Sequence, residues 1–131
     1  MVASTGVKPP TMVEDEKTVT DPHAWQSLAN GKLYVANIRD GLIAVDPEGK
    51  SVYEANAAKY LDALAKEEAD VRAALAALPQ ERRKIINASE TGAKIGGELY
   101  TDALSPPDGP APTYLDMFRH NVGALTAAVS A

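Results

Sequence analysis

The sequence of 131 residues contains no cysteine, and only 5% of its residues are aromatic. The absence of cysteine excludes a disulfide framework, cysteine-ligated zinc, iron–sulfur clusters and thiol catalysis. Few aromatic residues and abundant alanine favour helices packed through small side chains over a β-sandwich. No stretch is apolar enough and long enough to cross a bilayer, and residues 1–10 have no apolar core of a signal peptide, so we expect no export signal in the sequence as it stands.

The chain also lacks the patterns of nucleic-acid binding and of catalysis. Its formal net charge is -5, and its densest basic cluster is only Arg82-Arg83-Lys84, which excludes an electrostatic surface for nucleic acid. Gly96-Gly97 is not followed by the Lys-Ser/Thr of a phosphate-binding loop. No serine is spaced for a partnership with His and Asp, and no paired carboxylates indicate acid–base chemistry. The sequence therefore predicts a protein that is not an enzyme.

The first part of the chain is predicted to be irregular and then helical. Residues 1–20 are polar, and we expect an irregular lead-in with one short strand near Val2. Asp21 is a good N-cap and Pro22 fits a first helical position, so a short helix is predicted from Pro22 to about residue 30. A second helix is predicted from about residue 31 to Val45, followed by a break at 46–49.

The strongest helical signal covers Val52–Leu78, which is rich in Ala, Leu, Glu and Lys and ends before Pro79. A helix of this length usually connects two bodies of a protein. Two weak strands are predicted after it, at 82–86 and 93–99, and a proline-rich loop at 105–112 follows them.

A final helix is predicted after this loop. Thr113 fits its N-cap, with Asp116 three residues later as the capping-box partner. Its apolar residues fall on one face: Leu115, Phe118, Val122, Leu125 and Val129.

One local phrase carries a specific resemblance. Asp21-Pro22-His23-Ala24-Trp25, followed by Asn30 and Tyr34, resembles a hallmark of the zinc-, manganese- and iron-specific solute-binding proteins of ABC importers, also called adhesin-type lipoproteins. The likeness covers most of the chain and continues through further segments: Asp46-Pro47, Tyr53, Asn56, Tyr60-Leu61, Glu90-Thr91-Gly92-Ala93, Leu99 to Ser105 and Tyr114 to Asn121.

The resemblance implies a fold and a function. The fold is α/β and helix-rich, a partial version of a two-lobe solute-binding fold whose lobes are joined by one long helix. On that basis 1–50 is a remnant of the first lobe, 51–79 the connecting helix and 80–131 a remnant of the second lobe. The implied function is the substrate-binding component of a metal-ion ABC transporter. Such a component captures Zn²⁺ or Mn²⁺ between its lobes and docks on the importer's membrane permease, in a periplasmic or other extracytoplasmic compartment.

The family typically holds its metal with four side chains, and the resemblance places only some of them in this sequence. His23 matches the second histidine and Asp102 the closing aspartate. No counterpart of the first histidine is found, and we interpret the place of the third ligand, at 86–90, as lacking its motif. Glu90 or Glu98 are the candidates to replace that ligand. Because the chain looks N-terminally truncated and internally deleted, weak or lost metal binding is expected.

Other interpretations of these features remain open. Outside the family context, His23 is a polar residue in the first turn of a helix, and Asp102 is a turn or cap residue. His120 fits a solvated polar face of the last helix. The whole chain could be a small helical interaction module that self-associates through one apolar stripe, or a remnant without function. That stripe consists of Leu61, Leu64, Val71 and Leu75.

Overall fold

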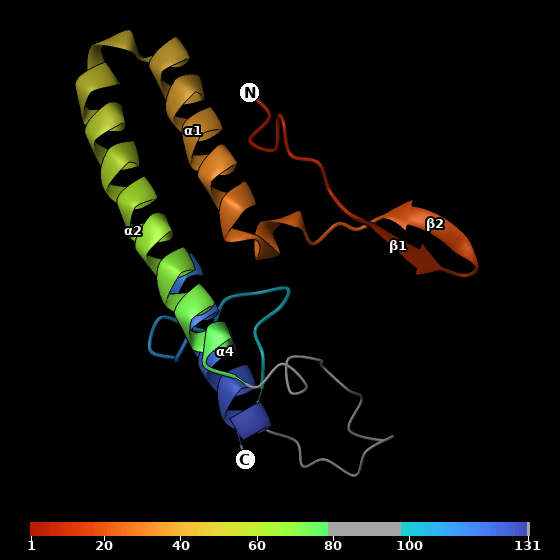
Figure 1. Ribbon diagram of the computed structural model, residues 1–131. Helices are drawn as coiled ribbons and strands as arrows, with labels where there is room; N and C mark the ends of the chain where they lie inside the picture. Colours follow the sequence, from red (N-terminus) through yellow and green to blue (C-terminus); the bar gives the residue numbers. More distant parts are fainter. Residues whose placement is uncertain (79–97, 131) are drawn as a thin grey trace. The chain divides into compact units, whose positions relative to one another are not determined.

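The computed structural model describes residues 1–78 and 98–130 (Figure 1). The chain divides into two compact units, residues 1–65 and 66–131, and each is described by itself. The predicted strand at 82–86 and almost all of that at 93–99 lie outside the described residues. In the described part, the chain is helix-rich with one two-stranded sheet.

The first unit begins with a β-hairpin where an irregular lead-in was predicted. Strands β1 (Thr11–Glu14) and β2 (Lys17–Thr20) pair antiparallel, with Thr11 opposite Thr20 and Glu14 opposite Lys17. The predicted strand near Val2 is wrong, because residues 3–6 form turns. The two loop residues, Asp15 and Glu16, have φ angles of 50° and 62°. Positive φ at both positions matches the right-handed twist of a hairpin but is usually supplied by Asn-Gly, which is why the turn was not expected.

The next helix starts later than predicted. Ala24–Gln26 form a single 3₁₀ turn (η1), and helix α1 runs from Leu28 to Val45. Its N-cap is Ser27, whose hydroxyl accepts a hydrogen bond from the Asn30 amide at 3.4 Å. Asp21 therefore does not cap a long helix, although it does accept a backbone hydrogen bond from His23. The predicted short helix and second helix are thus one turn of 3₁₀ helix and one α-helix.

A short connection joins α1 to the long helix. Pro47–Gly49 form a second 3₁₀ turn (η2), as the predicted break at 46–49 requires. Asp46 caps this turn through the Gly49 amide and accepts a 2.6 Å hydrogen bond from the Tyr53 hydroxyl. Helix α2 then runs from Lys50 to Ala76, within two residues of its predicted ends, and contributes residues to both units.

The second unit contains the end of α2, the loop that precedes the last helix, and that helix itself. Helix α4 runs from Tyr114 to Ser130 and has the N-cap half of the predicted capping box: the Asp116 amide donates to the Thr113 hydroxyl at 3.2 Å, and this hydroxyl donates to the Asp116 carboxylate at 2.6 Å. The proline-rich loop is closed by Ser105, whose amide donates to the Ala111 carbonyl while its hydroxyl accepts from the Ala111 amide, both at 2.9 Å. Both residues are buried, so the loop is a folded part of the unit.

A buried ion pair lies in the apolar stripe of α2, at Glu67 between Leu64 and Val71. Glu67 is 4% exposed, and its carboxylate accepts a 2.8 Å salt bridge from Arg119 on α4. Arg119 also pairs with Asp116 one turn earlier at 3.1 Å. A buried carboxylate without a partner is costly, so this contact fixes Glu67 against α4.

None of the described helices is long and apolar enough to cross a membrane.

Replacing Arg119 with Met should lower the free energy of unfolding by about 2 kcal/mol, because it leaves the Glu67 carboxylate buried without its cation. Urea denaturation measures this change. Arg72→Met is the matched control, because Arg72 pairs with Glu68 at 2.6 Å but is 77% exposed. It should cost less than about 0.5 kcal/mol. Equal losses in the two variants would contradict a special role for the Glu67–Arg119 pair.

Candidate functional site

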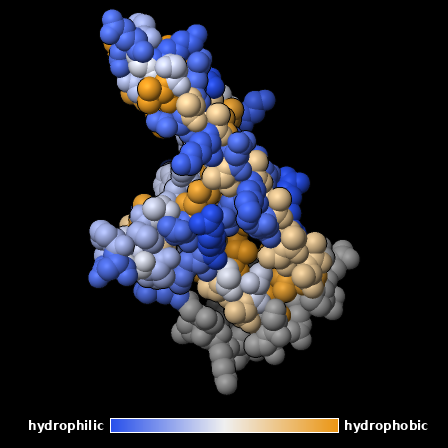
Figure 2. Space-filling model, turned by 90° about the vertical axis from the view of Figure 1, so that its left-hand side faces the viewer, coloured by the Kyte–Doolittle hydropathy of each residue, from blue (hydrophilic) through white to orange (hydrophobic). Residues whose placement is uncertain are grey.

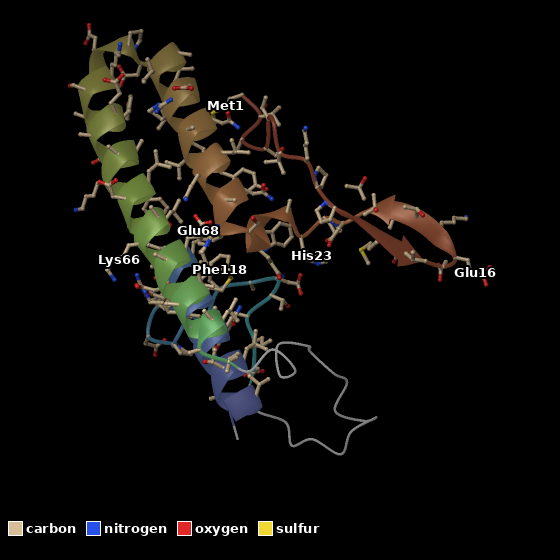
Figure 3. All side chains as sticks on the ribbon, viewed as in Figure 1. Met1, Glu16, His23, Lys66, Glu68 and Phe118 are labelled. Carbon is tan, nitrogen blue, oxygen red and sulfur yellow. The ribbon has the colours of Figure 1, made fainter. Side chains whose placement is uncertain are left out.

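His23 lies in the segment that joins the hairpin to α1, immediately before η1 (Figure 3). Its side chain is 39% exposed, so an ion can reach it from solvent. The imidazole packs edge-on against Trp25, with ring centroids 5.4 Å apart. The indole therefore limits the rotation of the imidazole.

The carboxylate of Asp21 orients the His23 ring. One oxygen, Oδ1, accepts from the His23 backbone amide at 2.8 Å and from Nδ1 at 2.7 Å. An ionised carboxylate can only accept, so Nδ1 carries a proton, and in the neutral ring the lone pair is then on Nε2. The pKa of Asp21 is held below its ordinary value of 3.8. The main cause is the hydrogen bond from the His23 backbone amide, and the hydrogen bond from the His23 ring lowers the pKa further. Carboxylate-held histidines of this kind are typical of metal ligands in proteins.

Asn30 fastens the histidine segment to α1. Its side-chain amide donates a 2.8 Å hydrogen bond to the carbonyl of Ala24, six residues earlier and next to His23. Because α1 is regular, this bond ties an irregular segment to a rigid element. The sequence identified Asn30 only as part of the motif, because the first predicted helix ended at about residue 30, whereas Asn30 lies in the first turn of α1.

Asp102 lies in the second unit, in an irregular segment before the proline-rich loop. Its carboxylate is exposed and accepts a 2.9 Å hydrogen bond from the Thr101 hydroxyl. The segment is anchored to α4 by Asn121, whose side chain accepts from the Tyr100 amide at 2.9 Å and donates to the Tyr100 carbonyl at 2.8 Å.

His120 makes a second contact with this segment. Its Nε2 donates to the Glu98 carbonyl at 3.0 Å, and its ring meets Tyr100 edge-on with centroids 5.3 Å apart. The predicted solvated face is therefore wrong for His120, which is half-buried and bonded to the main chain. The signal missed in the sequence was the adjacent pair His120-Asn121 on a helix that follows the candidate aspartate.

His23 and Asp102 belong to different units. Among residues 1–78 and 98–130, no three side chains of His, Asp or Glu come together as a metal-holding group. Glu98 is exposed, and Glu90 lies outside the described residues.

An apolar groove of about 420 Å³ runs between α1 and α2 in the first unit. It has neither a carboxylate nor an imidazole among its lining residues, so its chemistry does not suit a metal ion. The groove is lined by Val35, Ile38, Arg39, Leu42, Tyr53, Asn56, Ala57 and Tyr60.

Comparisons with known proteins point to one family. The family described as the periplasmic zinc-uptake complex component A, ZnuA, matches residues 1–90. The manganese-binding lipoprotein MntA of Halalkalibacterium halodurans is 26% identical over 178 aligned positions, which cover 88% of this chain and 59% of the relative. The manganese ABC transporter substrate-binding lipoprotein PsaA of Streptococcus pneumoniae is 42% identical over 66 residues, covering 50% of this chain and 21% of the relative.

A solved structure gives the same answer. The Mn-bound periplasmic metal-binding protein of Candidatus Liberibacter asiaticus superposes with a TM-score of 0.84 at 26% identity, covering 98% of this chain and 70% of that one. The curated relatives are longer than this chain, which covers 59% of MntA and 21% of PsaA and so spans less than two thirds of either. The alignment with MntA has 178 positions against a chain of 131 residues, so the relative contains internal residues that have no counterpart here.

The carboxyl carbon of Asp21, followed by NMR through an acid titration, should have its midpoint below 3.8. His23→Ala should raise that midpoint only in part, because the backbone hydrogen bond persists. Since the folded-state pKa is lowered, this contact stabilises the fold above the unfolded-state pKa, and the stabilisation is lost as pH falls through the lowered pKa. A midpoint at or above 3.8 in the unmodified protein would contradict the hydrogen bonds described.

Proposed function

The chain belongs to the ZnuA family of periplasmic zinc-uptake components, and from this membership we propose that it is a metal-receiving chain of an ABC importer. Members of this family are binding proteins of transport systems and not enzymes. The proposed cargo is a divalent ion, Zn²⁺ or Mn²⁺, bound reversibly by His23 and Asp102. The observation that carries the proposal is the Asp21–His23 hydrogen bond inside the family motif.

The chemistry of His23 supports a ligand role. A metal binds the unprotonated nitrogen of a neutral imidazole, and a carboxylate on the other nitrogen fixes the tautomer and raises ligand basicity. Asp21 supplies that carboxylate at 2.7 Å.

Two carboxylates are the proposed partners of His23. Asp102 is exposed in an anchored segment, as described above. Glu90 and Glu98 are the two candidates for a third ligand, and Glu98 is exposed. One imidazole and two carboxylates suit either Mn²⁺ or Zn²⁺, and three protein ligands plus water make an open site.

The two-lobe arrangement of the family is part of the proposal. We assign 1–50 to the remnant of a first lobe, 51–79 to the connecting helix and 80–131 to the remnant of a second lobe. Helix α2, at Lys50–Ala76, coincides with the proposed connection. The family places the protein in the periplasm, and the proposed partner is the permease of the importer. Fewer than four ligands would make metal binding weaker than in a complete receptor.

Self-association through α2 has little support in the structure. Of the stripe that motivated it, Leu64 is 0% exposed, Leu61 and Val71 are half-buried, and Leu75 alone is exposed. On the face shown in Figure 2, apolar residues form small patches broken by polar ones. Metal reception is therefore the better-supported function.

A thermal melt with and without excess MnCl₂ or ZnCl₂ tests the proposal. A ligand at 100 times its dissociation constant stabilises the fold by about 2.7 kcal/mol, which raises the midpoint of a chain of this size by about 10 °C. His23→Ala and Asp102→Asn should each reduce or remove this shift.

Asp108→Asn is the matched control, since it removes an exposed carboxylate from the proline-rich loop. Its metal-dependent shift should equal that of the unmodified protein. The assignment fails if His23→Ala keeps the full shift, or if neither ion moves the midpoint of the unmodified chain.

A further inference from the structure

The backbone of 98–100 is bonded to α4 at two successive helix positions. Asn121 makes two hydrogen bonds with Tyr100, at 2.9 and 2.8 Å, and His120 makes one with the Glu98 carbonyl at 3.0 Å. The side-chain amide of Asn121 thus reproduces the paired donor and acceptor of a β-ladder, and it joins residues 21 positions apart in sequence. The ring contact between His120 and Tyr100 adds to the same attachment.

We propose that His120 and Asn121 are the positioning residues of Asp102, an inference that rests on the proposed function. Asp102 follows Tyr100 by two residues, so the Cα of Asp102 lies at most about 7 Å from the Cα of Tyr100, the residue that Asn121 anchors. Its carboxylate is further restrained by the 2.9 Å hydrogen bond from Thr101. An exposed carboxylate on a loose segment loses conformational entropy when it binds an ion, and an anchored segment has lost it beforehand.

Two other polar residues at the start of α4 are bonded to groups outside residues 98–102. Arg119, next to His120, is committed to Glu67 and Asp116. The Thr113 hydroxyl caps α4. Among the described residues, His120 and Asn121 supply three hydrogen bonds between residues 98–102 and α4.

The first measurement is amide hydrogen exchange at Tyr100 in the metal-free protein, followed by NMR. Asn121→Ala removes both hydrogen bonds and should speed exchange at this amide by about tenfold. Asn121→Asp keeps an acceptor for the Tyr100 amide and should restore most of the protection. Gly123→Ala is the control on the same helix, because a Cβ there meets nothing within 4 Å and should leave exchange at Tyr100 unchanged.

The second measurement is the affinity for Mn²⁺, by calorimetric titration of the same variants with MnCl₂. Asn121→Ala should weaken binding by about tenfold, the usual effect of losing a residue that orients a metal ligand. His120→Gln, which loses the ring contact, should weaken it less. Gly123→Ala should bind as the unmodified protein does.

The two measurements separate this inference from the proposed function. Unmodified protein that binds neither Mn²⁺ nor Zn²⁺ in such a titration defeats the proposed function, and the exchange data at Tyr100 then test the anchoring independently. Unchanged exchange at Tyr100 in Asn121→Ala overturns the anchoring. Faster exchange with unchanged Mn²⁺ affinity overturns the positioning role.

Discussion

Hydrogen bonds from asparagine side chains to the main chain hold the irregular segments of this protein in place. Asn30 bonds to the Ala24 carbonyl, Asn37 bonds to the carbonyls of Ala3 and Thr5, and Asn121 pairs with Tyr100. Backbone groups of irregular segments need partners, and the described part of the chain has only a two-stranded sheet to supply them. Regular helices therefore fix the segments that carry His23 and Asp102. Both candidate ligands lie one or two residues from a main-chain group that a helical asparagine binds, Ala24 for His23 and Tyr100 for Asp102.

The parts of the fold that depend on local chemistry were predictable. The long helix is composed of good helix formers and is bounded by Asp46–Gly49 and Pro79, and the last helix begins with a capping box. The hairpin was missed because its turn uses Asp15 and Glu16 in a conformation that glycine and asparagine normally supply. The buried position of Glu67 could not be predicted, because its cation, Arg119, comes from a distant part of the sequence.

The motif in the sequence predicted the candidate ligands, but it did not predict the residues that hold these ligands in place. The sequence identified His23 and Asp102 through a family phrase. It assigned Asp21 to a helix cap, whereas the structure uses its carboxylate to fix the imidazole of His23. The role of Asn121 could not be predicted from the sequence. An asparagine in a helix is interpreted as a surface residue unless its main-chain partner is known, and here that partner, Tyr100, is 21 residues away. Local sequence patterns indicate ligands more readily than the residues that orient them.

The central claim is that His23 binds a divalent ion through its imidazole. Pulsed electron paramagnetic resonance on the Mn²⁺-loaded protein tests it most directly, because the method detects nitrogen nuclei bound to the manganese. The account predicts ¹⁴N modulation in the unmodified protein and none in His23→Ala, with His120→Gln unchanged, since the His120 Nε2 is bonded to the Glu98 carbonyl. A spectrum of Mn²⁺ without nitrogen coupling, or coupling that survives in His23→Ala, would contradict the account.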